Sequence, residues 1–272
     1  YYTGQLLDIP TISAAAHKAG IFVIWDLAHA AGNVILRLHN WNVDAAVWCN
    51  YKYLNSGPGS IGSLFLHENH SQVLREDSEV NFVNRLSGWW GSEKISRFAM
   101  DNVFNPISGA AGFQVSNPSI LDITSVMASL EIFSKVCQWE CQDQGKEQGI
   151  SILRQKSVRL TQYLENGLKN MAKYREKLFY IITPSDLEKR GAQLSLKLQP
   201  GLLGAVMREF EERGIVVDER QPDVIRVAPV PLYNSFEDCW LFIEAFSEAL
   251  EVAVRMKNGE IETKATKKLA EK

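Results

Sequence analysis

The first part of the chain alternates between helical and extended patterns of apolar residues. Residues 11–19 have the spacing of a helix, and Pro10 stands at its start, where a missing N–H group costs nothing. The six residues IFVIWD (21–26) form a nearly continuous apolar run, which is typical of a strand buried on both faces in a parallel sheet. Two further short apolar runs predict two more strands, DAAVWCN (44–50) and IGSLFLH (61–67).

The second part of the chain has a different order of elements. Residues 69–86 are polar and charged and predict an irregular loop, whereas 119–139 and 150–171 have helical periodicity. Beyond the polar stretch 142–148 we expect strands at 179–183, 192–198, 215–218 and 224–229, and helices at 202–214 and 236–254.

This order of elements predicts an α/β protein of two domains. Residues 1–142 would belong to a large domain with a mainly parallel sheet, 143–255 to a small α+β domain, and 256–272 to a polar tail that frays.

Composition narrows the function classes. With 272 residues and a net charge of -3, the chain has no excess of positive charge, so neither nucleic acid nor a membrane surface is expected as its main partner. No apolar run is long enough to span a bilayer. Four scattered cysteines are too few for a disulfide framework and indicate a reducing, cytoplasmic compartment. The chain opens with YYTGQLLDIP rather than methionine, so we expect a fragment of a longer fold.

Candidate chemistry lies at the ends of the first two predicted strands. Asp26 ends the run IFVIWD with His29 three residues later, and Lys52 follows the next strand beside Tyr51. Because ligands of open α/β sheets bind beyond the carboxyl ends of strands, these side chains can face one pocket. An aspartate and a lysine there suit pyridoxal phosphate (PLP), which a lysine holds as a Schiff base while a carboxylate pairs with the pyridinium nitrogen. By spacing alone, an N-cap aspartate and a surface lysine remain the commoner explanation.

Other polar motifs have simple structural explanations. HENH (67–70) has two histidines without a carboxylate or cysteine cluster, so we expect no metal site. Cys137 and Cys141 share one face of a predicted helix and are expected in the core. Asn117 stands before a proline, which is equally typical of a turn. Arg226 lies between apolar residues of a predicted strand, and a charge at such a position needs a partner.

A longer set of residue strings resembles the kynureninases, which are fold-type I PLP-dependent enzymes. The strings occur in matching order over nearly the whole chain: WDLAHAAGNV, DAAVWCNYKYLNSGPG, LSGWWG, RFAMDN, SNP and IRVAPVPLYNSFED. The resemblance implies hydrolysis of L-kynurenine or 3-hydroxy-L-kynurenine to an anthranilate and L-alanine, in tryptophan catabolism and NAD biosynthesis. It also implies a homodimer with active sites at the subunit interface.

The same resemblance implies roles for individual residues. Lys52 is similar to the Schiff-base lysine, Asp26 to the partner of the pyridinium nitrogen, and Tyr51 to a phosphate-bound tyrosine that also transfers protons. Arg226 is similar to the arginine that binds the substrate carboxylate, a planar task that suits a guanidinium. Three further residues match positions that line the cofactor and substrate site, partly across the dimer: His29, Trp89 and Asn117. A shift of one position would select Trp90 instead of Trp89.

Two alternatives stay open. One is another fold-type I enzyme, such as a cysteine desulfurase, although those enzymes usually have a histidine where this chain has Tyr51. The other is a catalytically inactive fragment, since a full kynureninase carries a long segment before YYTG. The sequence does not distinguish kynurenine from its 3-hydroxy form, a choice on which Asn117 bears.

Overall fold

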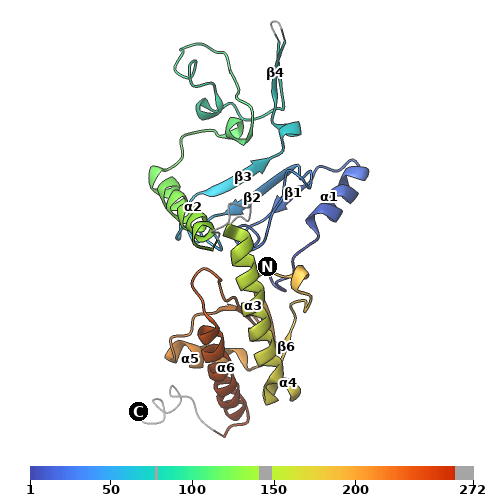
Figure 1. The fold of residues 1–272 in the computed structure, drawn as a ribbon, viewed down its shortest axis with the longest axis vertical. Helices are drawn as coiled ribbons and strands as arrows, with labels where there is room; N and C mark the ends of the chain where they lie inside the picture. The colour runs from blue at the N-terminus through green and yellow to red at the C-terminus, as the bar shows by residue number, and fades with distance from the viewer. Residues whose placement is uncertain (77–78, 141–148, 261–272) are drawn as a thin grey trace. The chain divides into compact units, whose positions relative to one another are not determined.

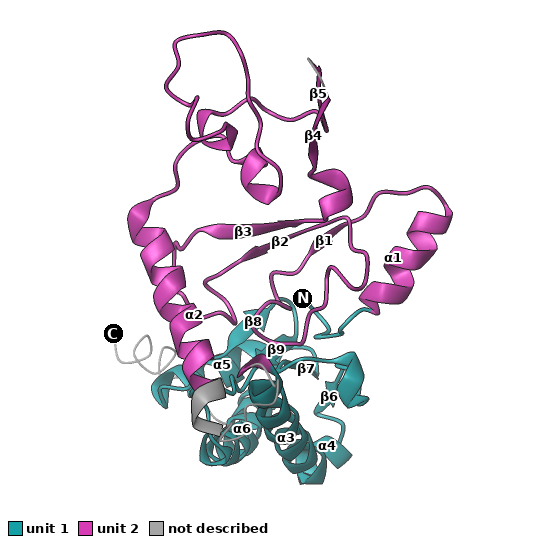
Figure 2. Cartoon of the chain, turned by 45° about the horizontal axis from the view of Figure 1, so that its top comes forward, with its two compact units in different colours: residues 1–7, 151–272 teal, residues 8–150 magenta. Residues whose placement is uncertain are grey.

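The computed structural model describes residues 1–76, 79–140 and 149–260, and these fall into two compact units (Figures 1 and 2). Unit 1 comprises residues 1–7 and the chain from 151 onward, and unit 2 comprises residues 8–150. The predicted boundary at 142, Cys141 and most of the predicted tail lie outside the described residues, as does the side chain of Cys137. None of the helices among the described residues has the length and apolar character that a bilayer crossing requires.

Unit 2 is built on a three-stranded sheet. Helix α1 (Ile9–Lys18) begins where the Asp8 side chain accepts a hydrogen bond from the Thr11 backbone N–H, with Pro10 in the first turn. Strand β1 (Ile24–Asp26) pairs in parallel with β2 (Ala45–Cys49), and β3 (Gly62–Leu66) pairs antiparallel with β2. One face of this sheet packs on a small core of buried and partly buried residues, among them Ile9, Leu27, Leu38, Val43, Ala46, Trp25, Trp48 and Phe65.

The opposite face of this sheet is exposed, so the prediction of a strand buried on both faces is wrong. The regular strand spans only Ile24–Asp26, and Ile24 is 65% exposed. The pairing places Asp26, Val47 and Leu64 in one row across the sheet, and both apolar members of that row are 41% exposed. Among the described residues β1 is an edge strand, and burial of an apolar run depends on neighbouring elements that the run itself does not specify.

The predicted irregular loop at 69–86 contains a hairpin, which corrects that expectation. Strands β4 (Val73–Glu76) and β5 (Glu79–Phe82) pair antiparallel after the 3₁₀ helix η1 (Glu68–His70). The Phe82 ring contacts Phe104 at 5.9 Å between ring centroids, and Arg75 forms an ion pair of 2.6 Å with Glu93. The unit continues through η2 (Trp89–Gly91) and η3 (Ala110–Phe113) to the long helix α2 (Ile120–Glu140).

Unit 1 has helices and a four-stranded antiparallel sheet in the order β6-β7-β9-β8. Its strands are β6 (Phe179–Ile181), β7 (Leu194–Leu198), β8 (Asp218–Arg220) and β9 (Val224–Val227). Its helices are α3 (Gly149–Asn170), α4 (Ala172–Arg175), η4 (Leu187–Lys189), α5 (Leu203–Glu212) and α6 (Phe236–Lys257). The strand predicted at 215–218 begins only at its last residue. The core includes fully buried side chains from helix and sheet, such as Leu164, Phe179, Leu196, Phe210, Ile225 and Phe246.

The first residues of the chain are bound to unit 1 through their backbone oxygens. The Gln193 side-chain amide donates to the Tyr1 oxygen at 3.0 Å, and the Ser195 hydroxyl donates to the Tyr2 oxygen at 2.6 Å. The Thr183 hydroxyl donates to the Thr3 oxygen, also at 2.6 Å. All three side chains are buried, so the amino-terminal segment satisfies hydrogen-bonding groups inside this unit.

Candidate functional site

Two neighbouring parallel strands bring the predicted cofactor residues to one edge of the unit 2 sheet. Strand β1 ends at Asp26, which pairs with Val47 of β2, and β2 ends at Cys49. Tyr51 and Lys52 follow directly after β2. Asp26 and the lysine loop therefore both lie beyond the carboxyl ends of adjacent parallel strands, where open α/β sheets bind ligands.

The turn after β1 is fixed by short-range hydrogen bonds. The Asp26 carboxylate accepts the Ala28 backbone N–H at 2.9 Å, and the Asn33 side chain donates to the His29 backbone oxygen at 2.9 Å. The His29 ring meets the Tyr53 ring edge-on, with 6.1 Å between ring centroids. Asp26 remains exposed, so its carboxylate is accessible to a ligand.

Gly32 brings this turn into direct contact with the lysine loop. Its φ is +77°, and a Cβ atom there would lie 2.8 Å from the Leu54 nitrogen and from the Tyr53 carbonyl group. Only glycine adopts such a conformation at low cost and leaves space for the neighbouring backbone. The close approach therefore couples the segment that contains Asp26 to the segment that contains Lys52.

The lysine loop has a defined internal conformation. The Lys52 oxygen accepts the Asn55 backbone N–H at 2.9 Å, and Asn55 has a φ of +56°. The Lys52 Nζ atom lies 5.5 Å from the centroid of the Tyr51 ring. Lys52 is half-buried, Tyr51 is 48% exposed, and Tyr53 is buried. The base of this loop is closed by Asn50 and Ser56, which were not among the predicted site residues; the available signal was an asparagine at the last position of a predicted strand.

This donor set fits PLP. An exposed carboxylate, a primary amine and a phenol lie at the same sheet edge, and these are the groups that pair with a ring nitrogen, bind an aldehyde and contact a phosphate. Neither Asp26 nor Lys52 forms an ion pair with another residue in the described parts of the chain.

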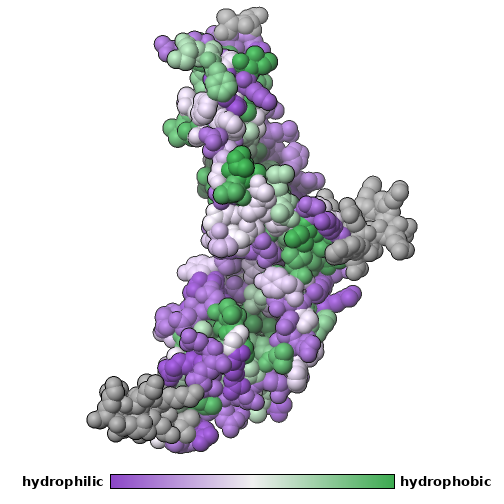
Figure 3. Space-filling view, turned by 90° about the vertical axis from the view of Figure 1, so that its left-hand side faces the viewer, coloured by the Kyte–Doolittle hydropathy of each residue, from purple (hydrophilic) through white to green (hydrophobic). Residues whose placement is uncertain are grey.

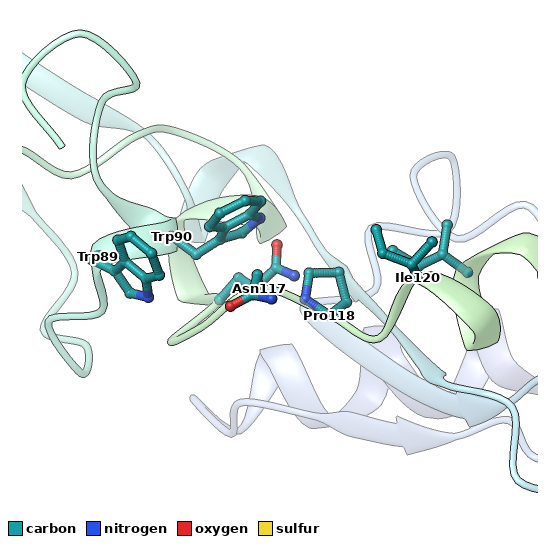
Figure 4. A pocket seen from close by; sticks show the side chains of 7 residues that line it. Trp89, Trp90, Asn117, Pro118 and Ile120 are labelled. Atoms are coloured by element: carbon teal, nitrogen blue, oxygen red, sulfur yellow. The ribbon is translucent and has the colours of Figure 1, made fainter. Parts of the chain in front are cut away.

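A second group of predicted residues lines a pocket elsewhere in unit 2 (Figure 4). The pocket has a volume of about 570 Å³, and its lining comes from η2, the segment before α2 and the first turn of α2: Trp89, Trp90, Gln114, Asn117, Pro118, Ile120 and Ile123. The Arg97 guanidinium stacks 4.3 Å from the Trp90 ring centroid and donates to the Trp90 oxygen at 3.1 Å. Two indole rings and two amides suit an aromatic ligand with polar substituents. Both tryptophans line the pocket, so the structure does not choose between them.

Arg226 belongs to unit 1, whereas all the other predicted site residues belong to unit 2. It lies on β9 opposite Asp218 of β8, and the two side chains form an ion pair. The guanidinium also donates to the Tyr1 backbone oxygen at 3.0 Å. The arginine thus has the partner that its place on a strand required.

The histidines of HENH have structural contacts. The His67 ring stacks on His39 at 4.8 Å, and His70 Nε2 lies 2.7 Å from the buried carboxylate of Asp44. That carboxylate also bonds to His17 at 2.8 Å and accepts the Val23 backbone N–H at 2.8 Å. Among the described residues, no group of three or more histidine, cysteine or acidic side chains has an arrangement that could hold a metal ion. Burial alone raises the pKa of Asp44, but its hydrogen bonds with Val23, His17 and His70 together hold that pKa below its usual value.

Comparison with known proteins shows that the chain is similar to kynureninases. Residues 153–246 match the family model described as the kynureninase C-terminal domain. Kynureninase 2 of Neurospora crassa is 62% identical over 257 residues, which are 93% of this chain and 52% of that protein. Kynureninase 1 of Chaetomium globosum is 56% identical in an alignment of 270 positions, which covers 93% of this chain and 51% of that protein. The chain therefore spans about half the length of the curated relatives it matches.

The fold itself matches solved structures of more distant proteins. A cysteine desulfurase from Thermococcus onnurineus has a TM-score of 0.67 and 16% identity, covering 91% of this chain and 57% of that one. At this identity the likeness concerns the fold alone, which is the fold-type I architecture of PLP-dependent enzymes.

Proposed function

Since the chain belongs to the kynureninase family and spans about half the length of its relatives, we propose that it carries part of a kynureninase active site. The proposed reaction is the PLP-dependent hydrolysis of L-kynurenine or 3-hydroxy-L-kynurenine to an anthranilate and L-alanine, a step of tryptophan catabolism toward NAD. The observation that carries this proposal is the shared sheet edge of Asp26, Tyr51 and Lys52, in a chain 62% identical to a kynureninase.

We assign the cofactor contacts to residues at that edge. Lys52 would hold PLP covalently through its amine, the Asp26 carboxylate would pair with the ring nitrogen, and the Tyr51 phenol would contact the phosphate. His29 lies in the turn that packs on Tyr53 and would flank the cofactor. When bound, PLP supplies an electron-accepting ring that stabilises negative charge at the substrate Cα.

The side chains of this edge would then move the protons of the reaction. The Lys52 amine would take the Cα proton of the substrate, acting as a general base. Water adds its oxygen to the γ-carbonyl carbon, and the Cβ–Cγ bond breaks so that this carbon becomes the anthranilate carboxylate. The Tyr51 phenol would give the proton that Cβ needs to become the methyl group of alanine. Its position next to Lys52 and its 48% exposure support this role.

We assign the two ends of the substrate to other residues. The Arg226 guanidinium suits the α-carboxylate, because its planar fork of donors matches both oxygens. The pocket of Trp89, Trp90 and Asn117 suits the aminophenyl ring. An amide at Asn117 would hydrogen-bond a ring hydroxyl and so favour 3-hydroxykynurenine.

We further propose that the protein acts as a cytoplasmic homodimer. Several large apolar side chains of unit 2 are exposed, among them Ile120, which lines the aromatic pocket, and Phe98, whose ring contacts Trp89. Groups of apolar side chains are visible on the face drawn in Figure 3. Such surfaces are typical of protein–protein contacts, and a second copy would bring its aromatic pocket to the Lys52 edge of the first. Cys49 and Cys239 are free thiols, which suits a reducing compartment.

The identity of the relatives favours kynureninase over a cysteine desulfurase. The kynureninases share 62% and 56% of residues with this chain, whereas the desulfurase structure shares 16%. The second alternative, an inactive piece of the enzyme, is decided by experiment.

The experiment is to incubate the purified chain with PLP, reduce it with borohydride and map the modified peptide. We expect a reducible absorbance band and modification at Lys52, both lost in Lys52→Ala. Lys18→Ala, which removes a lysine in the last turn of α1, is the control and should keep both. Release of anthranilate from L-kynurenine then tests activity. Modification spread over surface lysines without preference for Lys52 would contradict the cofactor assignment, and labelling without anthranilate release would identify an inactive piece.

A further inference from the structure

One asparagine and one serine close the base of the loop that carries Tyr51 and Lys52. Asn50 directly follows β2 and is 1% exposed. Its backbone oxygen accepts two hydrogen bonds from Ser56, one from the backbone N–H at 3.1 Å and one from the hydroxyl at 2.6 Å. Ser56 is itself buried, at 6% exposure. These bonds turn residues 51–55 into a closed loop.

The Asn50 side chain closes a wider loop as well. Its Nδ2 donates to the Ile61 oxygen at 2.5 Å and to the Ser63 hydroxyl at 2.9 Å, while its Oδ1 accepts the Trp48 indole N–H at 3.1 Å. The buried amide therefore connects the end of β2 to the start of β3. Asn50 therefore holds both ends of the segment 51–61, since it precedes Tyr51 in the chain and its side chain binds the Ile61 oxygen.

The position of the Lys52 amine depends on this backbone. In the described residues Lys52 has no ion-pair partner, and its amine contacts the ring of its neighbour Tyr51. A lysine side chain has high rotamer entropy, so a loose backbone would spread the amine over many positions. A backbone closed by buried hydrogen bonds limits this spread, which is how supporting residues preorganise a reactive group.

We propose that Asn50 and Ser56 are positioning residues for Lys52. Their hydrogen bonds hold the lysine at the carboxyl edge of the sheet, in place to bind an aldehyde cofactor. Neither residue acts on substrate or cofactor, because the side chains of both are used in closing the loop. The part of this proposal that concerns PLP rests on the proposed function, whereas the part that concerns the loop stands on the hydrogen bonds alone.

A test without cofactor compares Asn50→Ala and Ser56→Ala with Ser13→Ala. Ser13 is a matched control, because its fully buried hydroxyl accepts the Trp25 indole N–H at 2.9 Å within the same unit but away from the loop. The readout is the rate at which acetic anhydride acetylates Lys52, measured by mass spectrometry. We expect acetylation about fivefold faster in Ser56→Ala, the factor that one hydrogen bond provides, at least as large an increase in Asn50→Ala, which removes three side-chain hydrogen bonds, and no change in the control. Unchanged rates in folded Asn50→Ala and Ser56→Ala would overturn the proposal.

A test with PLP separates this proposal from the assignment of Lys52 to the cofactor. After incubation with PLP and borohydride reduction, modification of Lys52 should fall about fivefold in Ser56→Ala and at least as much in Asn50→Ala, while modification of surface lysines should not change. Faster acetylation in the variants, with no selective modification of Lys52 in the parent chain, would reject the cofactor assignment and keep the loop closure. Ser56→Ala keeps the question answerable if Asn50→Ala does not fold.

Discussion

Asp218 and Arg226 lie opposite each other on strands β8 and β9, and their side chains form an ion pair. The other oxygen of Asp218 lies 2.5 Å from the guanidinium of Arg220, so one carboxylate stands between two arginines. The two arginines differ in burial, since the Arg226 side chain is 10% exposed and that of Arg220 is 37% exposed. A buried guanidinium oriented by a carboxylate is better suited to hold a ligand than an exposed one.

We predict that Arg226→Gln weakens binding of L-kynurenine by about tenfold or more, because the substrate carboxylate loses charged hydrogen bonds. Arg220→Gln is the matched control, since it removes the other arginine beside Asp218 and should change binding little. Isothermal titration of the chain with L-kynurenine measures both. Equal affinities of Arg226→Gln and the parent chain would remove Arg226 from the site.

Gly32→Ala should disturb the lysine loop. Gly20 and Gly32 both have positive φ, +69° and +77°, but a Cβ atom at Gly20 meets nothing within 4 Å, whereas at Gly32 it meets backbone at 2.8 Å. Gly20→Ala should therefore cost only the left-handed strain, about 1–2 kcal/mol of unfolding free energy. Gly32→Ala should cost more and also reduce PLP modification of Lys52. Urea unfolding and peptide mapping give the comparison, and equal behaviour of the two variants would argue against the close approach.

Glu165→Gln should strongly destabilise unit 1. The Glu165 carboxylate bonds to the fully buried Arg190 at 2.6 Å and to Lys169 at 2.5 Å. Removal of one partner leaves a buried charge uncompensated, at a cost of about 3–5 kcal/mol. Glu251→Gln is the control, since its pair with Lys173 at 3.5 Å is exposed at the carboxylate and should contribute less than about 1 kcal/mol. Thermal unfolding followed by circular dichroism would show whether the two variants differ as expected.

Acid should weaken unit 2 through Asp44. Its pKa is lowered from 3.8 in the folded chain by the hydrogen bonds with Val23, His17 and His70, which together outweigh burial. A lowered pKa stabilises the fold above pH 3.8, and this contribution is lost as the pH falls through the folded pKa. Asp44→Asn should cost about 1–3 kcal/mol at neutral pH, and the gap to the parent chain should narrow below pH 3.8.

The control for Asp44 is Glu68→Gln, which removes an exposed carboxylate paired with His39 at 3.3 Å. Urea titrations at neutral and acidic pH measure both variants. A gap between Asp44→Asn and the parent chain that stays constant down to the lowest pH would contradict the role of the charge.

Cys239 should react slowly in the folded chain. Burial, together with the nearby Asp238 carboxylate, raises the pKa of its thiol from 9.0 to about 11. Near pH 8 this leaves about a hundredfold less thiolate than in the unfolded chain, and thiolate is the reactive form. Iodoacetamide labelling with and without urea, read by mass spectrometry, tests this expectation. Equal rates would place the thiol outside the core.

The positions of helices were predicted from the sequence more accurately than the burial and pairing of strands. Helix α6 begins at the capping box of Ser235 and Asp238, a signal confined to four consecutive residues. The hairpin at 73–82 escaped prediction because Arg75, Glu76 and Glu79 mask its alternation. The exposure of Ile24 was not predicted because an apolar run in the sequence does not determine which elements cover it.

In the candidate site, too, some features were predicted from the sequence and others were missed. Strand ends pointed to Asp26 and Lys52 at one sheet edge, and the observed pairing of β1 with β2 confirms that placement. Asn50, Ser56 and Gly32 were missed because their contribution arises from contacts between segments. The roles given to Trp89, Asn117 and Arg226 came from resemblance and stay predictions.

The hydrogen bonds of Tyr1, Tyr2 and Thr3 to unit 1 also bear on how the chain acquires its structure. Unit 1 is discontinuous, with residues 8–150 inserted between its two parts. During synthesis the whole of unit 2 is made before Thr183, Gln193 and Ser195, which bind the first three residues. Tyr1, Tyr2 and Thr3 can therefore form these hydrogen bonds only after Thr183, Gln193 and Ser195 have been made, so unit 1 is completed after the chain of unit 2. Removal of residues 1–7 would leave three buried polar side chains without their acceptors.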